Sequence, residues 1–270
     1  MSLRVAELNS RALIRAGGPE WRGFLHNLIT HDVEGLRPGE LRFAALLTPQ
    51  GKFLHDMFVL ADGDGAWLDV QAARRDDVLK RLLMYRLRAR VTLEAAAGTV
   101  KAAWGAAEAG AGWAADPRLP QLGWRAIGGG APTNATEDEY DAHRLKLGVP
   151  DPGRDLQADR TYPIEADFDL LDGIDFRKGC FIGQETTSRM KRRGTVKNRM
   201  LPITFEGPPP PFGAEVLAGE LRAGEVLSGR EGRAMALLRL DRIEGAALTV
   251  EGRPVRAAPP AWFPTYVEIE

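Results

Sequence analysis

Apolar residues near the N-terminus recur with the spacing of one helical face, at i, i+3, i+4, i+7 and i+8. These positions are Trp21, Phe24, Leu25, Leu28 and Ile29. Such spacing is typical of an amphipathic helix, and Pro19 suits the first helical turn because its missing N–H is not needed there. The pattern therefore predicts a helix over residues 19–29 with one buried face.

Residues 41–71 follow another pattern, in which short apolar runs alternate with turn residues. The runs LRFAALLT and KFLHDMFVL flank Pro49-Gln50-Gly51, and Asp62-Gly63-Asp64-Gly65 leads into AWLDVQA. We predict three antiparallel strands here. Helical spacing returns over residues 74–88, with apolar residues on one side and Arg, Lys and Asp on the other. The apolar positions of this second helix are Val78, Leu79, Leu82, Leu83 and Leu87.

The C-terminal third of the chain consists of short alternating runs. The Gly/Pro segment 207–213 predicts a stiff linker, because polyproline favours an extended backbone and cannot donate ladder hydrogen bonds. The runs that follow it have turns every 8–12 residues, which predicts a small β-barrel or sandwich of about 60 residues. Between residues 95 and 136 the period is weak, and we expect short strands such as VTLEA and GWRAI, followed by a short helix over 140–147.

Composition adds few constraints. The 270 residues allow two or three subdomains, the net charge is −1, and no run of 18 apolar residues predicts a membrane span. The single cysteine cannot form an internal disulfide, which fits a reducing compartment. Without a recognisable secretory signal, we expect a cytoplasmic protein.

That cysteine is Cys180, in the stretch RKGCFIGQE. Gly179 and Gly183 allow a tight turn or a close backbone approach to a ligand. Arg177 and Lys178 favour the thiolate, and a helix opening at residues 183–185 would add its amides. A small buried hydrophobe is the alternative reading of a lone cysteine. No histidine lies close in sequence to serve as a base, and one thiol cannot hold an iron–sulfur cluster alone, although bridging to a partner stays possible.

A basic segment surrounds the thiol. Residues 177–199 contain eight Lys or Arg side chains and one acid, whereas residues 151–176 carry eight acids and two bases. A solvated basic surface is one reading. A landing site for a polyanion, such as a phosphate, an oligoglutamate tail or RNA, is the other. Phe181 is the only aromatic residue of the segment, which argues against stacking of single-stranded nucleic acid.

The string KGCFIGQE, preceded by PIEADFDLLDGIDF, resembles the signature of the YgfZ-type folate-binding proteins. These are relatives of the glycine-cleavage T-protein, an aminomethyltransferase, and of a mitochondrial iron–sulfur cluster assembly factor. The segments FLHNLITHDVEGLRPGELRFAALLTPQGKFLHDMFVL, YDAHRLKLGVPD and GEVLSG…AMALLRL also fit this family. The resemblance covers most of the chain and is weakest over residues 95–135.

The resemblance implies an α+β, T-protein-like three-domain arrangement around a central folate cavity, with a C-terminal small β-barrel. We expect a discontinuous folate-binding core in residues 1–48 and 116–200 and a second α+β subdomain in 49–115. The barrel would occupy 201–270, with the 207–213 linker.

It also implies tetrahydrofolate, with one or more glutamates in its tail, as cofactor. The Glu165 carboxylate would accept two hydrogen bonds, from the N3–H and the 2-amino group of the pterin ring. Basic side chains would bind the carboxylates of the glutamate tail. The expected cofactor-binding residues are Glu165, Gly179, Gly183, Gln184, Arg189, Arg193 and Arg199, and the expected reactive residues are Cys180 and Lys178.

The implied function is an accessory role in assembly or repair of iron–sulfur enzymes, including those that modify tRNA. Cys180 would be the working thiol, the partners would be iron–sulfur proteins, and neither nucleic acid nor membrane would bind directly. A folate-dependent one-carbon transferase is the alternative, and a scaffold that docks a partner without folate is a third hypothesis.

One departure from the transferase pattern bears on that alternative. Where the T-protein has an adjacent acidic pair, this chain has His55-Asp56. If the required carboxylate maps to His55, amine transfer has lost its polar anchor. If it maps to Asp56, the route stays open.

Overall fold

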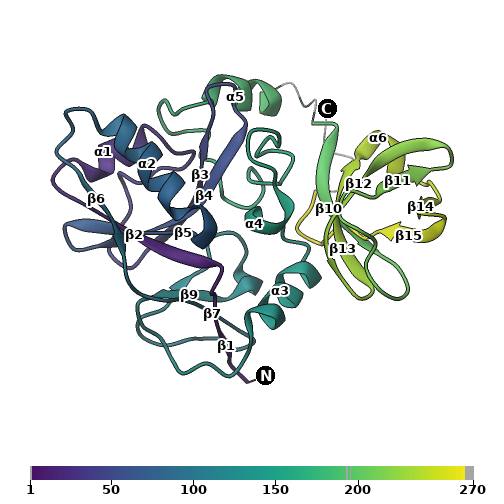
Figure 1. Ribbon diagram of the computed structural model, residues 1–270, viewed down its shortest axis with the longest axis horizontal. Helices are drawn as coiled ribbons and strands as arrows, with labels where there is room; N and C mark the ends of the chain where they lie inside the picture. The colour runs from purple at the N-terminus through teal and green to yellow at the C-terminus, as the bar shows by residue number, and fades with distance from the viewer. Residues whose placement is uncertain (1, 193, 195, 265–270) are drawn as a thin grey trace.

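Two antiparallel sheets and a closed barrel organise the chain in the computed structural model, which describes residues 2–192, 194 and 196–264 (Figure 1). The larger sheet has the strand order β3-β4-β5-β2-β6. Its strands are β2 (Arg11–Gly17), β3 (Leu41–Leu47), β4 (Phe53–Asp62), β5 (Gly65–Gln71) and β6 (Thr92–Ala96). The predicted three-stranded meander over residues 41–71 is therefore confirmed as β3, β4 and β5.

Alternation along β4 divides its side chains between two cores. Met57 and Val59 pack on one face, beneath helices α1 (Trp21–His26) and α2 (Arg75–Arg86). Phe58 packs on the other face, with the aromatic core of the molecule. Because side chains alternate along a strand, His55 and Asp56 also leave β4 on opposite faces.

Helix α2 follows the short 3₁₀ turn η1 (Ala72–Arg74) and departs from the expected packing. Val78 and Leu82 are buried, but Leu83 and Leu87 are 38% and 87% exposed. The apolar side that the spacing predicted is therefore buried only in part. The sheet covers only a narrow stripe of the helix, and residues 83 and 87 lie beyond it.

The smaller sheet has the order β1-β7-β9-β8, and short turns connect β1 to β2 and β6 to β7 of the two sheets. Its strands are β1 (Arg4–Glu7), β7 (Val100–Trp104), β8 (Ala114–Ala115) and β9 (Trp124–Ile127), with the 3₁₀ turn η2 (Pro120–Leu122). The helices that follow are α3 (Glu137–Lys146), α4 (Pro152–Asp155) and α5 (Gln184–Arg192). A capping box formed by Thr136 and Glu139 satisfies the first amides of α3. The predicted strands VTLEA and GWRAI and the helix that begins after Gly183 are confirmed.

The C-terminal barrel closes in the order β10-β13-β12-β11-β14-β15 and carries helix α6 (Leu240–Ile243). Its strands are β10 (Asn198–Thr204), β11 (Glu215–Ala218), β12 (Leu221–Arg230), β13 (Arg233–Arg239), β14 (Leu248–Val250) and β15 (Arg253–Ala257). The Gly/Pro segment 207–213 lies in the connection between two barrel strands, β10 and β11. It is not the linker that was expected ahead of it, because β10 is already a barrel strand.

Strand β10 also joins the barrel to the rest of the molecule. Leu201 and Ile203 point into the barrel interior, whereas Met200 joins the aromatic core that contains Phe168. The amide of Met200 donates to the carbonyl oxygen of Glu165, at 2.7 Å. The expected domain boundary at residues 48–49 likewise falls inside one sheet, since β3 and β4 form a continuous ladder. In the described part of the chain, no helix has the length and apolar content to cross a membrane.

Candidate functional site

Cys180 is exposed, on the loop that leads into α5. The loop is anchored on both sides of the thiol. Phe181 is buried in the aromatic core, and Lys178 is tied to the end of α1. The reading of this cysteine as a buried hydrophobe is therefore wrong, and the thiol is presented to solvent on a fixed stretch of backbone.

Lys178 supplies the first anchor. Its Nζ donates to the carbonyl oxygens of His26, of Ile29 at 2.7 Å and of His31 at 3.2 Å. Burial lowers the pKa of Lys178 to about 8, against the opposing effect of the nearby carboxylates. Its three donors are used on backbone carbonyls, which argues against the reactive role that the resemblance implied for Lys178.

The two glycines of the motif have different surroundings. Gly183 has φ +82°, and a Cβ there would lie 2.7 Å from the carbonyl oxygen of Thr48 and 2.9 Å from Cα of Gly51. It is required by close backbone packing, which a ligand is not needed to explain. A Cβ at Gly179 would meet only Nε2 of His26, at 3.9 Å.

The fold thus brings His26 next to the cysteine loop, across more than 150 positions of sequence. Its Nδ1 lies 2.8 Å from Oδ1 of Asp32, which also accepts the amide of Glu34 at 2.9 Å. Sequence reasoning did not single out either residue. Their six-residue spacing on one short helix and turn was the only available signal, and it is not specific.

Glu165 lies at a cavity of about 290 Å³ between the core and the barrel. Its Oε2 accepts the amide of Tyr162 at 3.0 Å, and its Oε1 accepts Nδ2 of Asn198 at 3.2 Å. Each carboxylate oxygen can accept more than one hydrogen bond, so the group can still receive the edge of a pterin. Lys52 and Arg160 line the same cavity and were not identified from sequence.

The other expected tail ligands are dispersed. Arg199 is buried and donates to Asp167 and, bidentately, to Asp169. Its guanidinium is thus neutralised by the Asp169 carboxylate, which argues against a role in binding a folate tail. Arg189 is exposed on α5, Gln184 begins that helix half-buried, and Arg193 lies outside the described residues.

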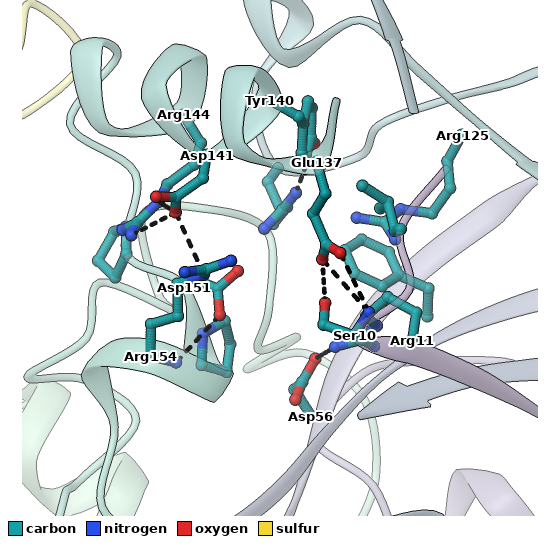
Figure 2. A pocket seen from close by; sticks show the side chains of 15 residues that line it. Ser10, Arg11, Asp56, Arg125, Glu137, Tyr140, Asp141, Arg144, Asp151 and Arg154 are labelled. Atoms are coloured by element: carbon teal, nitrogen blue, oxygen red, sulfur yellow. Dashed lines mark hydrogen bonds and ion pairs between the residues drawn. The ribbon is translucent and has the colours of Figure 1, made fainter. Parts of the chain in front are cut away.

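A second cavity lies at the centre of the molecule, where α3 faces the larger sheet (Figure 2). Glu137 of α3 reaches the amide and hydroxyl of Ser10, and the walls carry many charged groups. Its charged lining residues are Arg11, Asp56, Arg118, Arg125, Glu137, Asp141, Arg144, Asp151 and Arg154. The enclosed space is only about 30 Å³. A pterin does not fit there, because pockets for ligands of that size measure roughly 300–1,000 Å³.

Buried ion pairs fill this centre. Asp69 accepts Nε of Arg11 at 2.6 Å and a terminal nitrogen of Arg125 at 2.7 Å. Asp56 accepts Arg11 at 2.7 Å and Nε2 of Gln71 at 2.7 Å. Both acids are fully buried, so each guanidinium that enters the protein interior is matched by carboxylate oxygens.

The structure also separates the two residues of the His55-Asp56 pair. Asp56 faces the central cavity, whereas His55 faces α2, where burial and then Arg74 and Arg81 lower its pKa to about 4. The acid that occupies the cavity is therefore Asp56. Asp56 is fully buried and its charge is already compensated by the Arg11 guanidinium at 2.7 Å, which argues against the amine-transfer route at this point.

The complete fold, barrel included, is that of an aminomethyltransferase-type protein. The solved aminomethyltransferase T of the glycine cleavage system from Bartonella henselae superposes with a TM-score of 0.74 over 96% of this chain and 85% of that one, at 17% identity. Residues 197–265 match the family described as "CAF17, C-terminal beta-barrel domain". The predicted fold class is confirmed.

Curated relatives narrow the assignment. The human iron–sulfur cluster assembly factor IBA57, mitochondrial, is 31% identical over 96% of this chain and 85% of its own length. The homologues from Pyricularia oryzae and Neurospora crassa are 30% and 28% identical, and the chain spans 75% and 66% of their lengths. This chain belongs to the IBA57 family of iron–sulfur cluster assembly factors. The predicted cytoplasmic location is contradicted by these relatives, because their names describe them as mitochondrial proteins.

Proposed function

We propose that this protein is an accessory factor in iron–sulfur protein assembly, in which the Cys180 thiolate binds a metal ion or cluster jointly with a client protein. The observation that carries the proposal is the exposed thiol on an anchored loop. A thiolate is the ligand that iron–sulfur clusters prefer. The names of the relatives support the assembly role.

Joint binding follows from the number of ligands. A cluster is usually held by four protein ligands, and Cys180 is the only cysteine in the chain. Among the described residues, no group of three or more His, Cys, Asp or Glu side chains could hold a metal ion. The remaining ligands would therefore come from the client. Service to enzymes that modify tRNA is part of this proposal and rests on the sequence resemblance.

Replacing Cys180 with alanine is expected to abolish the restoration of iron–sulfur enzyme activity in a deletion strain. Because the thiol is exposed, the change should alter the free energy of unfolding by less than about 0.5 kcal/mol, which thermal unfolding would check. Arg177→Ala, an exposed neighbour in the same loop, is the control and should restore activity. Full restoration by the Cys180 variant would remove the thiol from the function.

We further propose that tetrahydrofolate binds at the Glu165 cavity, whose volume and carboxylate fit a pterin better than the closed centre does. Lys52 and Arg160, rather than the predicted arginines, would meet the glutamate tail, because both line this cavity. Bound there, folate would supply a one-carbon carrier, but the pairing of the buried Asp56 with Arg11 favours an accessory role over a transferase.

Replacing Glu165 with glutamine should weaken tetrahydrofolate binding about tenfold or more, since a hydrogen bond to a charged group contributes about 1.5–3 kcal/mol. Isothermal titration calorimetry is the measurement. Glu185→Gln, an exposed acid on α5, is the matched control and should bind like the unmodified protein. No heat from the unmodified protein at high folate concentration would refute the folate proposal and leave the thiol proposal standing.

A further inference from the structure

We propose that His26 is a second ligand of the jointly held metal, binding iron through Nε2 beside the thiolate of Cys180. This inference rests on the proposed function, because it assigns a further donor to the same site. It is carried by the hydrogen bond of His26 to Asp32, the unpaired Nε2, the position of Gly179 and the anchoring of the cysteine loop.

The hydrogen bond to Asp32 determines which imidazole nitrogen is free. Oδ1 of Asp32 also accepts the Glu34 amide at 2.9 Å, so this oxygen acts as a hydrogen-bond acceptor. A carboxylate only accepts hydrogen bonds, so Nδ1 of His26 must carry the proton in their 2.8 Å contact. In the neutral ring, Nε2 then holds the lone pair. A carboxylate behind the distal nitrogen is the usual arrangement of metal-binding histidines.

Nε2 is available to a ligand. Within the described residues it has no hydrogen-bond partner, and it is not among the unpaired side-chain atoms that the fold seals from solvent. The rest of the ring is held in place, since the side chain is only 12% exposed. Gly179 lies over this nitrogen, and the missing side chain keeps the neighbouring space open.

Hydrogen bonds of Lys178 connect the backbone of the Cys180 loop to the backbone of the helix that carries His26. Lys178 donates to the carbonyl oxygen of His26 itself and to those of Ile29 and His31. The backbone that carries Cys180 is therefore tied, two residues away, to the helix end that carries His26. A pair of ligands fixed before the metal arrives loses little conformational freedom on binding.

The two donors suit iron. Cysteine thiolate and neutral imidazole both bind iron, and histidine replaces cysteine on one iron of Rieske-type clusters. On binding, the Cys180 thiol releases its proton to solvent as the Sγ–metal bond forms, and His26 contributes its Nε2 lone pair while keeping the Nδ1 proton on Asp32. Two ligands make half a site, and the client supplies the other half.

Anaerobic titration of the purified protein with Co²⁺ tests the inference, because thiolate-to-cobalt charge transfer reports Cys180 and the visible bands report the other ligands. We expect His26→Gln to weaken Co²⁺ binding at least tenfold and to change the visible bands. Asp32→Asn should weaken binding about tenfold, as loss of a carboxylate behind a ligating histidine typically does. His143→Gln is the matched control, since that ring belongs to α3 and its Nε2 already bonds the Gln121 carbonyl.

The outcomes separate this inference from the proposed function. If His26→Gln binds Co²⁺ with unchanged affinity and spectrum while Cys180→Ala loses the charge-transfer band, His26 is not a ligand and the thiol proposal stands. If Cys180→Ala retains the full spectrum, or the unmodified protein binds no Co²⁺, both fail. Thermal unfolding of each variant identifies any loss that comes from misfolding.

Discussion

Replacing Asp69 with alanine is expected to destabilise the protein more than any other single charge removal at its centre. Asp69 is fully buried and accepts hydrogen bonds from Arg11 and Arg125, on two different sheets. Breaking a buried ion pair by removing one partner typically costs about 3–5 kcal/mol, because the remaining charge stays desolvated. For a chain of this size, that corresponds to a melting temperature lower by about 10 °C.

The reason lies in what the two guanidiniums would lose. Arg11 retains Asp56, at 2.7 Å, but Arg125 would retain only a distant contact with Asp116, at 4.0 Å. Among the described residues, Nε of Arg125 already has no hydrogen-bond partner, and it is buried from solvent. Arg125 therefore has no compensating carboxylate within direct hydrogen-bonding distance once Asp69 is gone.

Differential scanning calorimetry would measure the change, with Asp62→Ala as the matched control. Asp62 also pairs with an arginine of β2, Arg15, but its side chain is 54% exposed. Exposed pairs contribute at most about 1 kcal/mol. Equal and small shifts for the two variants would show that the centre is hydrated enough to tolerate an uncompensated arginine.

A second large effect is expected at Gly183, within the cysteine motif. The Cβ of Gly183→Ala would collide with Thr48 and Gly51, and the φ of +82° is strained for any residue with a side chain. Strain in the left-handed region and overpacking each cost about 1–3 kcal/mol. We therefore expect the free energy of unfolding to fall by about 3 kcal/mol, which chemical denaturation would measure. We also expect the Cys180 loop to be displaced, which would change the alkylation rate of the thiol.

Gly179→Ala is the control within the same motif, because the nearest atom to its Cβ is 3.9 Å away. An ordinary contact of this kind should change stability by less than about 0.5 kcal/mol. If Gly179→Ala is the more damaging of the two, the backbone packing described for Gly183 is not what the motif preserves.

Periodicity predicted the elements that depend on local pattern. The alternation in KFLHDMFVL determines β4, and the helical spacing from Trp21 onward determines α1, although this helix ends at His26, three residues before Ile29. The barrel was recognisable from its evenly spaced turns. Its first strand was missed because Pro202 interrupts the run NRMLPIT, and proline usually argues against a paired strand.

Long-range pairing could not be predicted in the same way. The sequence pattern assigns Arg11 and Asp69 to strands, but nothing in it says that residues 58 positions apart share a hydrogen bond. The exposure of Leu83 and Leu87 depends on how wide a stripe of α2 the sheet covers. For the site, the motif located Cys180, whereas the placement of His26 beside it required the packing of the loop on α1.

Strand β10 shows why the barrel is not a removable module. Its successive side chains pack in different hydrophobic cores. Met200 packs in the aromatic core that contains Phe168, and Leu201 packs in the barrel interior. Leu227 and Met235, from two other barrel strands, pack in the same hydrophobic core as Met200. A truncation before β10 would remove all three side chains. The apolar surface that they cover would then be exposed to solvent and would favour aggregation.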